Sequence, residues 1–306
     1  MWIAGLLYFV SVYSSIHSNK FKFDLIHSHF AYPDGFSSIL LGKVFRKPVV
    51  ITVHGSDINL YTHKMDYLKP LVIYALKNAT HIIAVSTALK NRIVELGISE
   101  DKISVIHNGY NPELFKPMDK NEIRKSLELP FNKKIVLFVG NLIPAKGVTY
   151  LIEAMEIIST IRNDVILLIV GDGYLRPKLE KMVQQQRLCN QIIFVGRQPY
   201  EKIPLWMNSS DLLVLPSISE GFGAVLIEAA ACGKPIVATN VGGIPEASLE
   251  SFRRLVPPKD PNSLALSILD ILGSNFNSNE IIKENRKFSM SNITNQLLDV
   301  YNNLEK

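Results

Sequence analysis

Residues 135–173 read IVLFVGNLIPAKGVTYLIEAMEIISTIRNDVILLIVGDG and contain the pattern that decides the fold. Two apolar runs, Ile135–Val139 and Val165–Val170, are each followed at once by a glycine. Between them, Thr149–Thr160 carries apolar residues at helical spacing. A run of apolar residues without alternation is typical of a strand covered on both faces. The stretch therefore predicts a strand–helix–strand unit whose strands are parallel.

The same alternation extends in both directions along the chain. Further strands are predicted at Asp24–His27, Val49–His54, Ile82–Ser86, Ser104–His107, Ile192–Val195, Leu212–Leu215 and Ile236–Thr239. Further helices are predicted at Tyr67–Asn78, Thr87–Leu96, Leu175–Arg187 and Phe222–Ala231. Alternating strands and helices predict an α/β protein with parallel sheets and helices on both faces.

Length and composition narrow the class of protein. The 306 residues predict two domains at roughly 150 residues each. With 47% hydrophobic and 20% charged residues, disordered and collagen-like classes are excluded. The net charge of +5 is too small for a dedicated nucleic-acid binder, but it suits anionic substrates or an anionic membrane surface. Cys189 and Cys232 lack metal-ligand spacing and favour a reducing cytoplasm.

The first residues, MWIAGLLYFVSVYSSIHS at 1–18, are apolar and then become serine-rich. They lack the basic start and the small-residue cleavage site of a signal peptide. They are also shorter than the ~20 apolar residues of a membrane span. We expect a buried helix packed on a sheet, with a weakly membrane-associating helix as the alternative. The expected location is the cytoplasm, with peripheral contact at the inner face of the membrane as an option.

Prolines at 112, 117 and 130 mark a stiff connector between two domains. We expect an amino-terminal domain over 1–115, a second domain over 116–279, and a carboxy-terminal helix over 280–306 that packs back toward the first domain. The first domain has four predicted strands and lacks a glycine-rich strand-to-helix turn at its beginning, which doubly wound domains commonly have. This pattern predicts an incomplete, truncated first domain.

Three segments of the second domain have the composition of a phosphate cradle: V139-G-N-L-I-P-A-K-G147, V170-G-D-G173 and E220-G-F-G223. The first two follow strands and the third precedes a helix, where ligands of open α/β sheets bind. Lys146 adds a positive charge, and the glycines allow the backbone to approach a ligand closely. Ordinary strand-to-helix turns also use glycine, but three such segments in one domain favour a phosphate ligand.

Two glutamates flank the third segment. Glu228 lies in the otherwise apolar helix A224-V-L-I-E-A-A-A231, where a carboxylate needs a partner. That partner is either the two hydroxyls of a ribose or a cation such as Lys234. Glu220 either caps the following helix or contacts the reacting end of a ligand.

Histidines gather at strand ends of the first domain. His54 ends V49-V-I-T-V-H54 and is expected to point into the ligand crevice, while Asp57 is interpreted as an N-cap. Together with His27 and His29 it makes a three-histidine metal site conceivable. No carboxylate or cysteine completes a familiar ligand spacing, so polar residues lining a cleft are the preferred interpretation.

Taken together, these strings resemble glycosyltransferase family 4 (glycosyl transferases group 1), which are retaining nucleotide-sugar transferases of the GT-B fold. The most specific match is E220-G-F-G-A-V-L-I-E228, with two glutamates separated by seven residues. Supporting matches are Gly140–Gly147, Gly171–Gly173 and V241-G-G-I-P-E246, and in the first domain D24-L-I-H-S-H29, T52-V-H-G-S-D57 and V105-I-H-N-G109.

The resemblance implies a two-domain enzyme with a nucleotide-diphosphate sugar held by the second domain and a cleft between the domains. It implies that Lys146 neutralises the diphosphate, that Glu228 binds the ribose, and that Glu220 contacts the transferring sugar. The backbone at Gly221, Phe222 and Gly223 would cover the phosphates, and His54 would face the sugar. It further implies transfer with retention and without a catalytic metal or cofactor, so that His54, Glu220 and Lys146 are the expected catalytic residues.

Donor-binding residues are expected at Gly140, Asn141, Lys146, Gly171, Gly173, Glu220, Gly221, Phe222, Gly223 and Glu228. Asn141 departs from the family, which commonly has Arg at this position, so one charge-assisted phosphate contact is missing. Family members also carry roughly 60–80 more amino-terminal residues, so a partner chain that supplies strands is conceivable. The expected acceptor is a glycan, a lipid-linked molecule or a small molecule, in cell-envelope polysaccharide biosynthesis. The alternatives are a catalytically impaired or split-enzyme subunit that binds nucleotide sugar, and a nucleotide-sugar epimerase.

Overall fold

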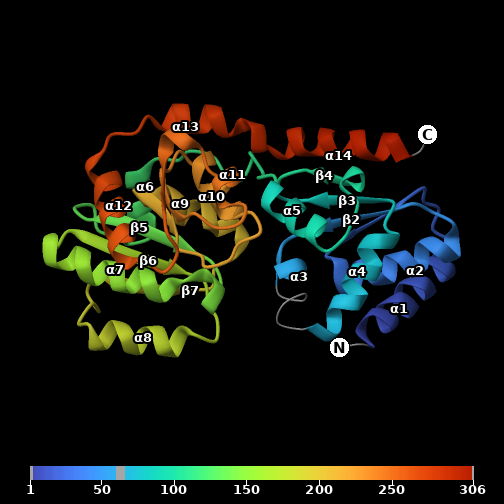
Figure 1. Cartoon of the computed structure of the whole chain (residues 1–306). Coiled ribbons are helices and arrows are strands. Elements are labelled where there is room, and N and C mark those ends of the chain that lie inside the picture. The colour runs from blue at the N-terminus through green and yellow to red at the C-terminus, as the bar shows by residue number, and fades with distance from the viewer. Residues whose placement is uncertain (1–2, 60–65, 305–306) are drawn as a thin grey trace. The chain divides into compact units, whose positions relative to one another are not determined.

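The computed structural model describes residues 3–59 and 66–304, and the chain divides into two compact units (Figure 1). Unit 1 comprises Met1–Asn108 and Ser291–Lys306, and unit 2 comprises Gly109–Met290. Each unit is built around its own parallel sheet, so the predicted α/β class with two parallel-sheet domains is confirmed.

The sheet of unit 1 has four parallel strands in the order β1-β2-β3-β4. Their bounds are β1 (Ile26–His29), β2 (Val49–Val53), β3 (His81–Ala84) and β4 (Ile103–Val105). The register sets Ser28 opposite Ile51 and Ile83 opposite Ser104. Every residue of β2 is buried, as the continuous apolar run predicts.

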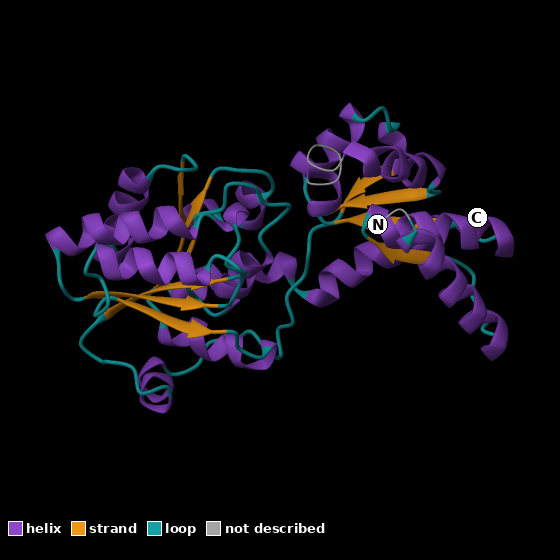
Figure 2. Ribbon diagram, turned by 90° about the horizontal axis from the view of Figure 1, so that it is seen from below, coloured by secondary structure: helices purple, strands orange, loops and turns teal. Residues whose placement is uncertain are grey.

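Helices of unit 1 lie on both faces of this sheet (Figure 2). They are α1 (Ala4–Asn19), α2 (Phe36–Phe45), α3 (Ser56–Asn59), α4 (Lys69–Asn78), α5 (Thr87–Glu95) and α14 (Met290–Leu304), with single turns at η1 (Ala31–Gly35), η2 (Asp66–Leu68) and η3 (Glu100–Lys102). The last helix, α14, packs Ile293, Leu297 and Val300 against Val50 and Ile83 of the sheet. The carboxy-terminal helix thus belongs to the core of unit 1.

Helix α1 differs from the expected buried helix. It packs against α2 and η1, where the buried Gly5 lies so close to Phe36 that a Cβ would come within 2.8 Å of the ring. Its outer face is exposed, with Leu7 64% and Val10 58% accessible, because apolar residues surround the helix and only one side meets the unit. In the part of the chain that the structure describes, no helix combines the length and apolarity of a membrane span.

The sheet of unit 2 has six parallel strands in the order β10-β9-β8-β5-β6-β7. Their bounds are β5 (Lys134–Val139), β6 (Val165–Val170), β7 (Ile192–Gly196), β8 (Leu212–Leu215), β9 (Ile236–Thr239) and β10 (Arg253–Val256). The strand–helix–strand pattern of residues 135–173 forms β5, α7 and β6 at the centre of the unit. All six residues of β6 are buried.

Helices also cover both faces of the second sheet (Figure 2). They are α6 (Lys120–Ser126), α7 (Val148–Ile161), α8 (Arg176–Gln185), α9 (Ile203–Ser209), α10 (Ala224–Ala231), α11 (Ile244–Ala247), α12 (Pro261–Gly273) and α13 (Ser278–Asn285). Single turns are η4 (Pro144–Lys146), η5 (Tyr200–Lys202), η6 (Glu250–Phe252) and η7 (Arg286–Phe288).

The strand β10 is not among the predicted elements. It pairs on one side with β9 and begins with Arg253 and Arg254, so it lacks the continuous apolar run of a central strand. Arg254 instead forms an ion pair with Asp270 of α12 at 2.7 Å. Edge strands of this kind carry charge, and a search for buried runs misses them.

The unit boundaries lie at Asn108 and Met290 rather than at 115 and 279. Residues just after Asn108 bind to unit 2, because the N–H of Tyr110 donates to the Phe288 carbonyl at 3.0 Å. At the other end, Asn285 of α13 donates its side-chain amide to the Ile227 carbonyl of α10 at 2.8 Å. Helix α13 therefore belongs to unit 2.

Candidate functional site

The glycine-rich loops of unit 2 gather at the carboxyl ends of neighbouring strands. A Cβ on Gly171, which follows β6 and has φ +132°, would lie 1.9 Å from the Gly140 carbonyl oxygen after β5. A Cβ on Gly173 would lie 2.5 Å from the carbonyl oxygen of Leu142. Only glycine permits this approach, so these two predicted cradle segments are packed directly against each other.

The loop after β8, which contains the third segment Glu220–Gly223, is packed against the same group of loops. A Cβ on Gly147 would lie 2.0 Å from the carbonyl oxygen of Pro216, which directly follows β8. On the other side, a Cβ on Gly242, after β9, would lie 1.9 Å from the carbonyl oxygen of Glu220. The loops after β6, β5, β8 and β9 therefore form one continuous group at the carboxyl ends of these four neighbouring strands.

Lys146 and Glu220 meet within this group. The Lys146 ammonium lies 2.6 Å from the Glu220 carboxylate, and the Ser217 hydroxyl donates to the same oxygen at 3.1 Å. Both side chains are largely buried, with 24% and 14% exposed. Lys146 and Ser217 thus hold one oxygen of the Glu220 carboxylate, which favours a role at the ligand over a cap of α10. Ser217 is a contact that the sequence analysis did not identify.

Helix α10 begins next to this ion pair. Gly223 is its N-cap residue with φ +90°, a conformation that favours glycine, and it has no side chain with which to cap the helix. Phe222 is buried and packs edge-on against Phe288 with ring centroids 5.9 Å apart. The Phe222 side chain thus anchors the loop, and only its backbone is available to a ligand. Asn141 lies exposed after β5.

Glu228, the fifth residue of α10, is held by Tyr200. The tyrosine hydroxyl donates to the Glu228 carboxylate at 2.9 Å. Burial raises the pKa of Glu228 to about 7, while the hydrogen bond from Tyr200 acts in the opposite direction. The proposed pairing with Lys234 is wrong, because the Lys234 ammonium donates to the Asn208 carbonyl at 3.1 Å. Tyr200 follows β7 and has no sequence feature that marks it as a partner of α10.

Unit 1 brings its histidines together. His54 directly follows β2, and its Nε2 lies 2.9 Å from Nδ1 of His29 at the end of β1. His27 bridges two hydroxyls, with Nε2 at 2.8 Å from Thr52 and Nδ1 at 2.5 Å from Tyr301 of α14. Burial and then the neighbouring His29 lower the pKa of both His27 and His54 to about 4. Both rings are therefore neutral near pH 7.

The metal alternative for these histidines gains no support from their contacts. His27 faces hydroxyl groups, and within residues 3–59 and 66–304 no group of three His, Cys, Asp or Glu side chains is arranged to hold a metal ion. Asp57 is not an N-cap: its buried carboxylate accepts the N–H groups of Ala31, Gly55 and His54 at 3.0, 2.9 and 3.2 Å. Asp57 thereby positions the backbone of His54.

Family models match both parts of the chain. One described as glycosyl transferases group 1 matches residues 119–288, and one described as glycosyltransferase family 4 matches residues 4–114. An uncharacterised glycosyltransferase of Methanocaldococcus jannaschii is 34% identical over 275 residues, which are 88% of this chain and 72% of that protein. The putative teichuronic acid biosynthesis glycosyltransferase TuaC of Bacillus subtilis is 33% identical, over 80% of this chain and 60% of TuaC.

The fold is also found among solved structures. The crystal structure of Anabaena HepE in complex with UDP superimposes with a TM-score of 0.84 and 24% sequence identity. The match covers 96% of this chain and 82% of HepE.

Proposed function

Because the chain belongs to the glycosyl transferases group 1 family and has the GT-B fold, we propose that it transfers a sugar from a nucleotide-diphosphate sugar to an acceptor. The proposed reaction retains the configuration at the anomeric carbon and uses no metal ion. The proposed acceptor is a glycan, a lipid or a small molecule.

The contact between Lys146 and Glu220 carries this proposal. In a nucleotide-diphosphate sugar the phosphate is bonded directly to the anomeric carbon. A site for this bond therefore needs a cation for the phosphate beside a polar group for the sugar. Lys146 and Glu220, 2.6 Å apart at the start of α10, supply that combination. The helix adds its N-terminal N–H groups and its dipole, which favour an anion.

Glu228 and Tyr200 suit the ribose. Glu228 lies four residues into α10 from Ala224, which places its Cα about 6 Å along the axis from the helix start. A diphosphate at the helix start would leave the ribose near this depth. The Glu228 carboxylate can accept hydrogen bonds from two vicinal hydroxyls, and the Tyr200 hydroxyl orients it.

The chemical step follows from these positions. The bond between the anomeric carbon and the diphosphate oxygen breaks, and Lys146 with the α10 N–H groups stabilises the charge on the departing diphosphate. The acceptor hydroxyl adds on the same face and gives its proton to the leaving phosphate oxygen. Glu220 holds the sugar. The neutral His54 can form a hydrogen bond to a sugar hydroxyl without adding charge.

The acceptor is proposed from the relatives and from α1. TuaC is named for teichuronic acid biosynthesis, and it supports a role for this chain in cell-envelope polysaccharide synthesis. The exposed apolar side chains Leu6, Leu7 and Val10 of α1 support peripheral contact with a membrane surface. Cosedimentation with anionic vesicles tests this contact. Loss of binding in Leu7→Ser is expected, and no binding by the unmodified chain would contradict it.

A second candidate function is a subunit that binds nucleotide sugar and needs a partner chain. The observation in its favour is a cavity of about 410 Å³ between α1 and β1, the strand at one edge of the sheet. The buried Ser28 hydroxyl lines this cavity and has no hydrogen-bond partner among the described residues. An extended segment of another chain could pair with β1 there.

Two assays separate these candidates. Thermal shift with UDP, GDP and ADP and their sugars tests nucleotide binding, starting with UDP, the ligand of HepE. Transfer of a radiolabelled sugar to lipid and glycan fractions tests the enzyme. Binding together with transfer supports the transferase, and binding without transfer favours the subunit. Release of free nucleotide without an acceptor would favour an epimerase. Lys146→Ala and Glu228→Ala are expected to weaken nucleotide binding, and unchanged affinity in both would refute the donor site.

A further inference from the structure

Unit 2 contains a second polar cavity, away from the glycine loops. It has a volume of about 270 Å³ and lies where several elements begin. Lys134 is the first residue of β5, Asp211 directly precedes β8, and Lys234 stands two residues before β9. Lys120 reaches the cavity from α6, and Ser278 lies at the start of α13. The cavity therefore opens at the amino-terminal ends of the strands.

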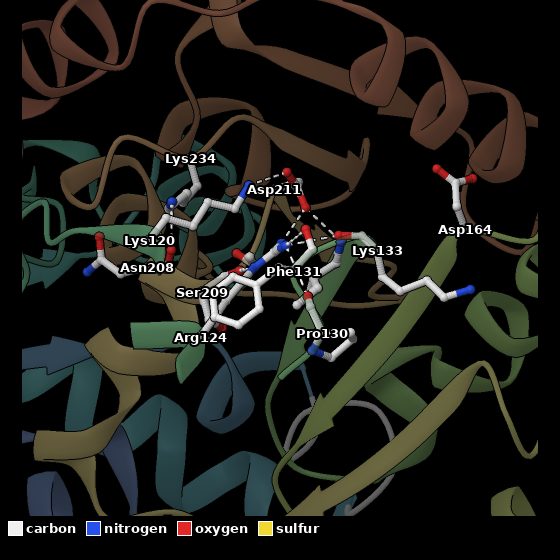
Figure 3. A network of polar contacts seen from close by, with 12 residues as sticks. Lys120, Arg124, Pro130, Phe131, Lys133, Asp164, Asn208, Ser209, Asp211 and Lys234 are labelled. Atoms are coloured by element: carbon white, nitrogen blue, oxygen red, sulfur yellow. Dashed lines mark hydrogen bonds and ion pairs between the residues drawn. The ribbon is translucent and has the colours of Figure 1, made fainter. Parts of the chain in front are cut away.

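Positive charge predominates in this cavity. Lys120, Lys134 and Lys234 line it, and Asp211 is the single acidic residue among its lining residues. The Asp211 carboxylate is already satisfied: Lys120 pairs with one oxygen, and Arg124 at 2.8 Å and the Ile135 N–H at 2.7 Å hold the other. Figure 3 shows Lys120 and Arg124 converging on Asp211.

Arg124 forms an ion pair with Asp211 but does not itself line the cavity. Its buried guanidinium also donates to the carbonyl oxygens of Ser209, Pro130 and Lys133 (Figure 3). Arg124 and the three lysines carry four positive charges against the single carboxylate of Asp211, so positive charge remains in excess around the cavity.

Lys120 and Lys234 each have N–H donors beyond the one used in the contacts described here. Lys234 uses one for the Asn208 carbonyl, and Lys120 uses one for Asp211, out of three on each ammonium. Lys134 is exposed, and its ammonium is in none of the ion pairs found among residues 3–59 and 66–304. Burial and then the charge of Lys120 lower the pKa of Lys234 to about 8, while the nearby Asp211 carboxylate acts in the opposite direction.

We propose that this cavity is a binding site for a small phosphate-type dianion, either inorganic phosphate or the phosphate group of a small ester. A dianion between Lys120, Lys134 and Lys234 would neutralise their excess charge and accept their remaining N–H groups. The cavity volume suits a ligand of this size better than a whole nucleotide.

The cavity is separate from the proposed donor site. The donor loops follow the carboxyl ends of β5, β6, β8 and β9, whereas this cavity lies at the amino ends of the strands of the same sheet. The six residues of β5 span about 17 Å between its two ends. The two sites can therefore be occupied together, and the proposal does not depend on the proposed function.

Isothermal titration of the full chain with sodium phosphate tests the site, with sodium chloride at equal ionic strength as the blank. Lys134→Gln removes one exposed ammonium without breaking a pair, and we expect about tenfold weaker binding. Lys234→Met is expected to weaken binding at least as much, and urea unfolding checks that it remains folded. Lys125→Gln, an exposed lysine of α6 outside the cavity, is the matched control and is expected to bind like the unmodified chain.

Lys146→Ala distinguishes this cavity from the donor site and is expected to retain phosphate binding. Absence of phosphate binding, equal weakening by Lys125→Gln, or loss of binding in Lys146→Ala alone would overturn the proposal. A parallel titration with glycerol 3-phosphate identifies the source of the anion. Tighter binding of the ester assigns the site to phosphate esters, and tighter binding of inorganic phosphate assigns it to the free ion.

Discussion

The ion pair between Lys146 and Glu220 competes with any anion that needs the Lys146 ammonium. A nucleoside diphosphate lacks the transferable sugar that Glu220 is proposed to contact, so it gains nothing from the carboxylate and must displace it from Lys146. We therefore expect Glu220→Gln to tighten the binding of a nucleoside diphosphate. The same change is expected to slow sugar transfer, because the proposed contact between the carboxylate and the sugar is lost.

The magnitude follows from the geometry of the pair. A nitrogen–oxygen distance of 2.6 Å is short, and the side chains are 24% and 14% exposed, so the pair lies between the surface and the buried case. Breaking it costs about 1 kcal/mol, which corresponds to roughly fivefold in the dissociation constant. Lys146→Met is expected to change affinity in the opposite direction, by tenfold or more for a charge-assisted contact at about 1.5 kcal/mol.

Isothermal titration with the nucleoside diphosphate that stabilises the chain most measures both effects. Glu284→Gln, an exposed glutamate of α13, removes the same charge at a distance from the pair and is expected to leave affinity unchanged. If Glu220→Gln weakened nucleotide binding as much as Lys146→Met, the two residues would not compete, and the reasoning would be refuted.

Substitutions of Glu228, Arg124 and His54 test three further features of the structure. Because burial raises the pKa of Glu228 to about 7, the folded protein binds an extra proton between 4.5 and about 7 and loses stability as the pH rises through this window. In urea unfolding, Glu228→Gln should be about 3 kcal/mol more stable than the unmodified chain near pH 8 and equal to it near pH 4. Equal stability of the two proteins at both pH values would contradict this. Arg124→Met leaves the Asp211 carboxylate without the Arg124 guanidinium and should lower the free energy of unfolding by about 3–5 kcal/mol. Lys125→Met should change the free energy of unfolding by less than about 0.5 kcal/mol. Similar losses in both variants would contradict the role of Arg124 beside Asp211. His54→Ala should abolish transfer and keep nucleotide affinity, and a large loss of affinity would instead place His54 among the donor contacts.

The central strands and the glycine loops were predictable because their signals are local. Buried parallel strands need continuous apolar runs, and β6 and β8 have the predicted bounds. Glycines after such strands indicate close backbone approach, and Gly171 and Gly173 serve that purpose. The structure adds that the backbone they approach belongs to the neighbouring loop, which sequence spacing alone does not reveal.

Partners across the fold were not predictable in the same way. Tyr200 meets Glu228 because of how the loop after β7 lies against α10, and no spacing links the two residues. Lys234 is close to Glu228 in sequence, yet it faces the carbonyl oxygen of Asn208. In α1, composition indicates an apolar helix, but its exposure depends on how much of the unit surrounds it.

The most direct test of the donor site is a thermal-shift measurement of the 306-residue chain with UDP, GDP, ADP and their common sugars. A nucleotide at 100 times its dissociation constant stabilises the folded chain by roughly 2.7 kcal/mol. We expect a selective increase in melting temperature for nucleotides of one base, and its loss in Lys146→Ala and Glu228→Ala. A well-folded sample whose melting temperature changes with no nucleotide or nucleotide sugar would contradict the proposed donor site.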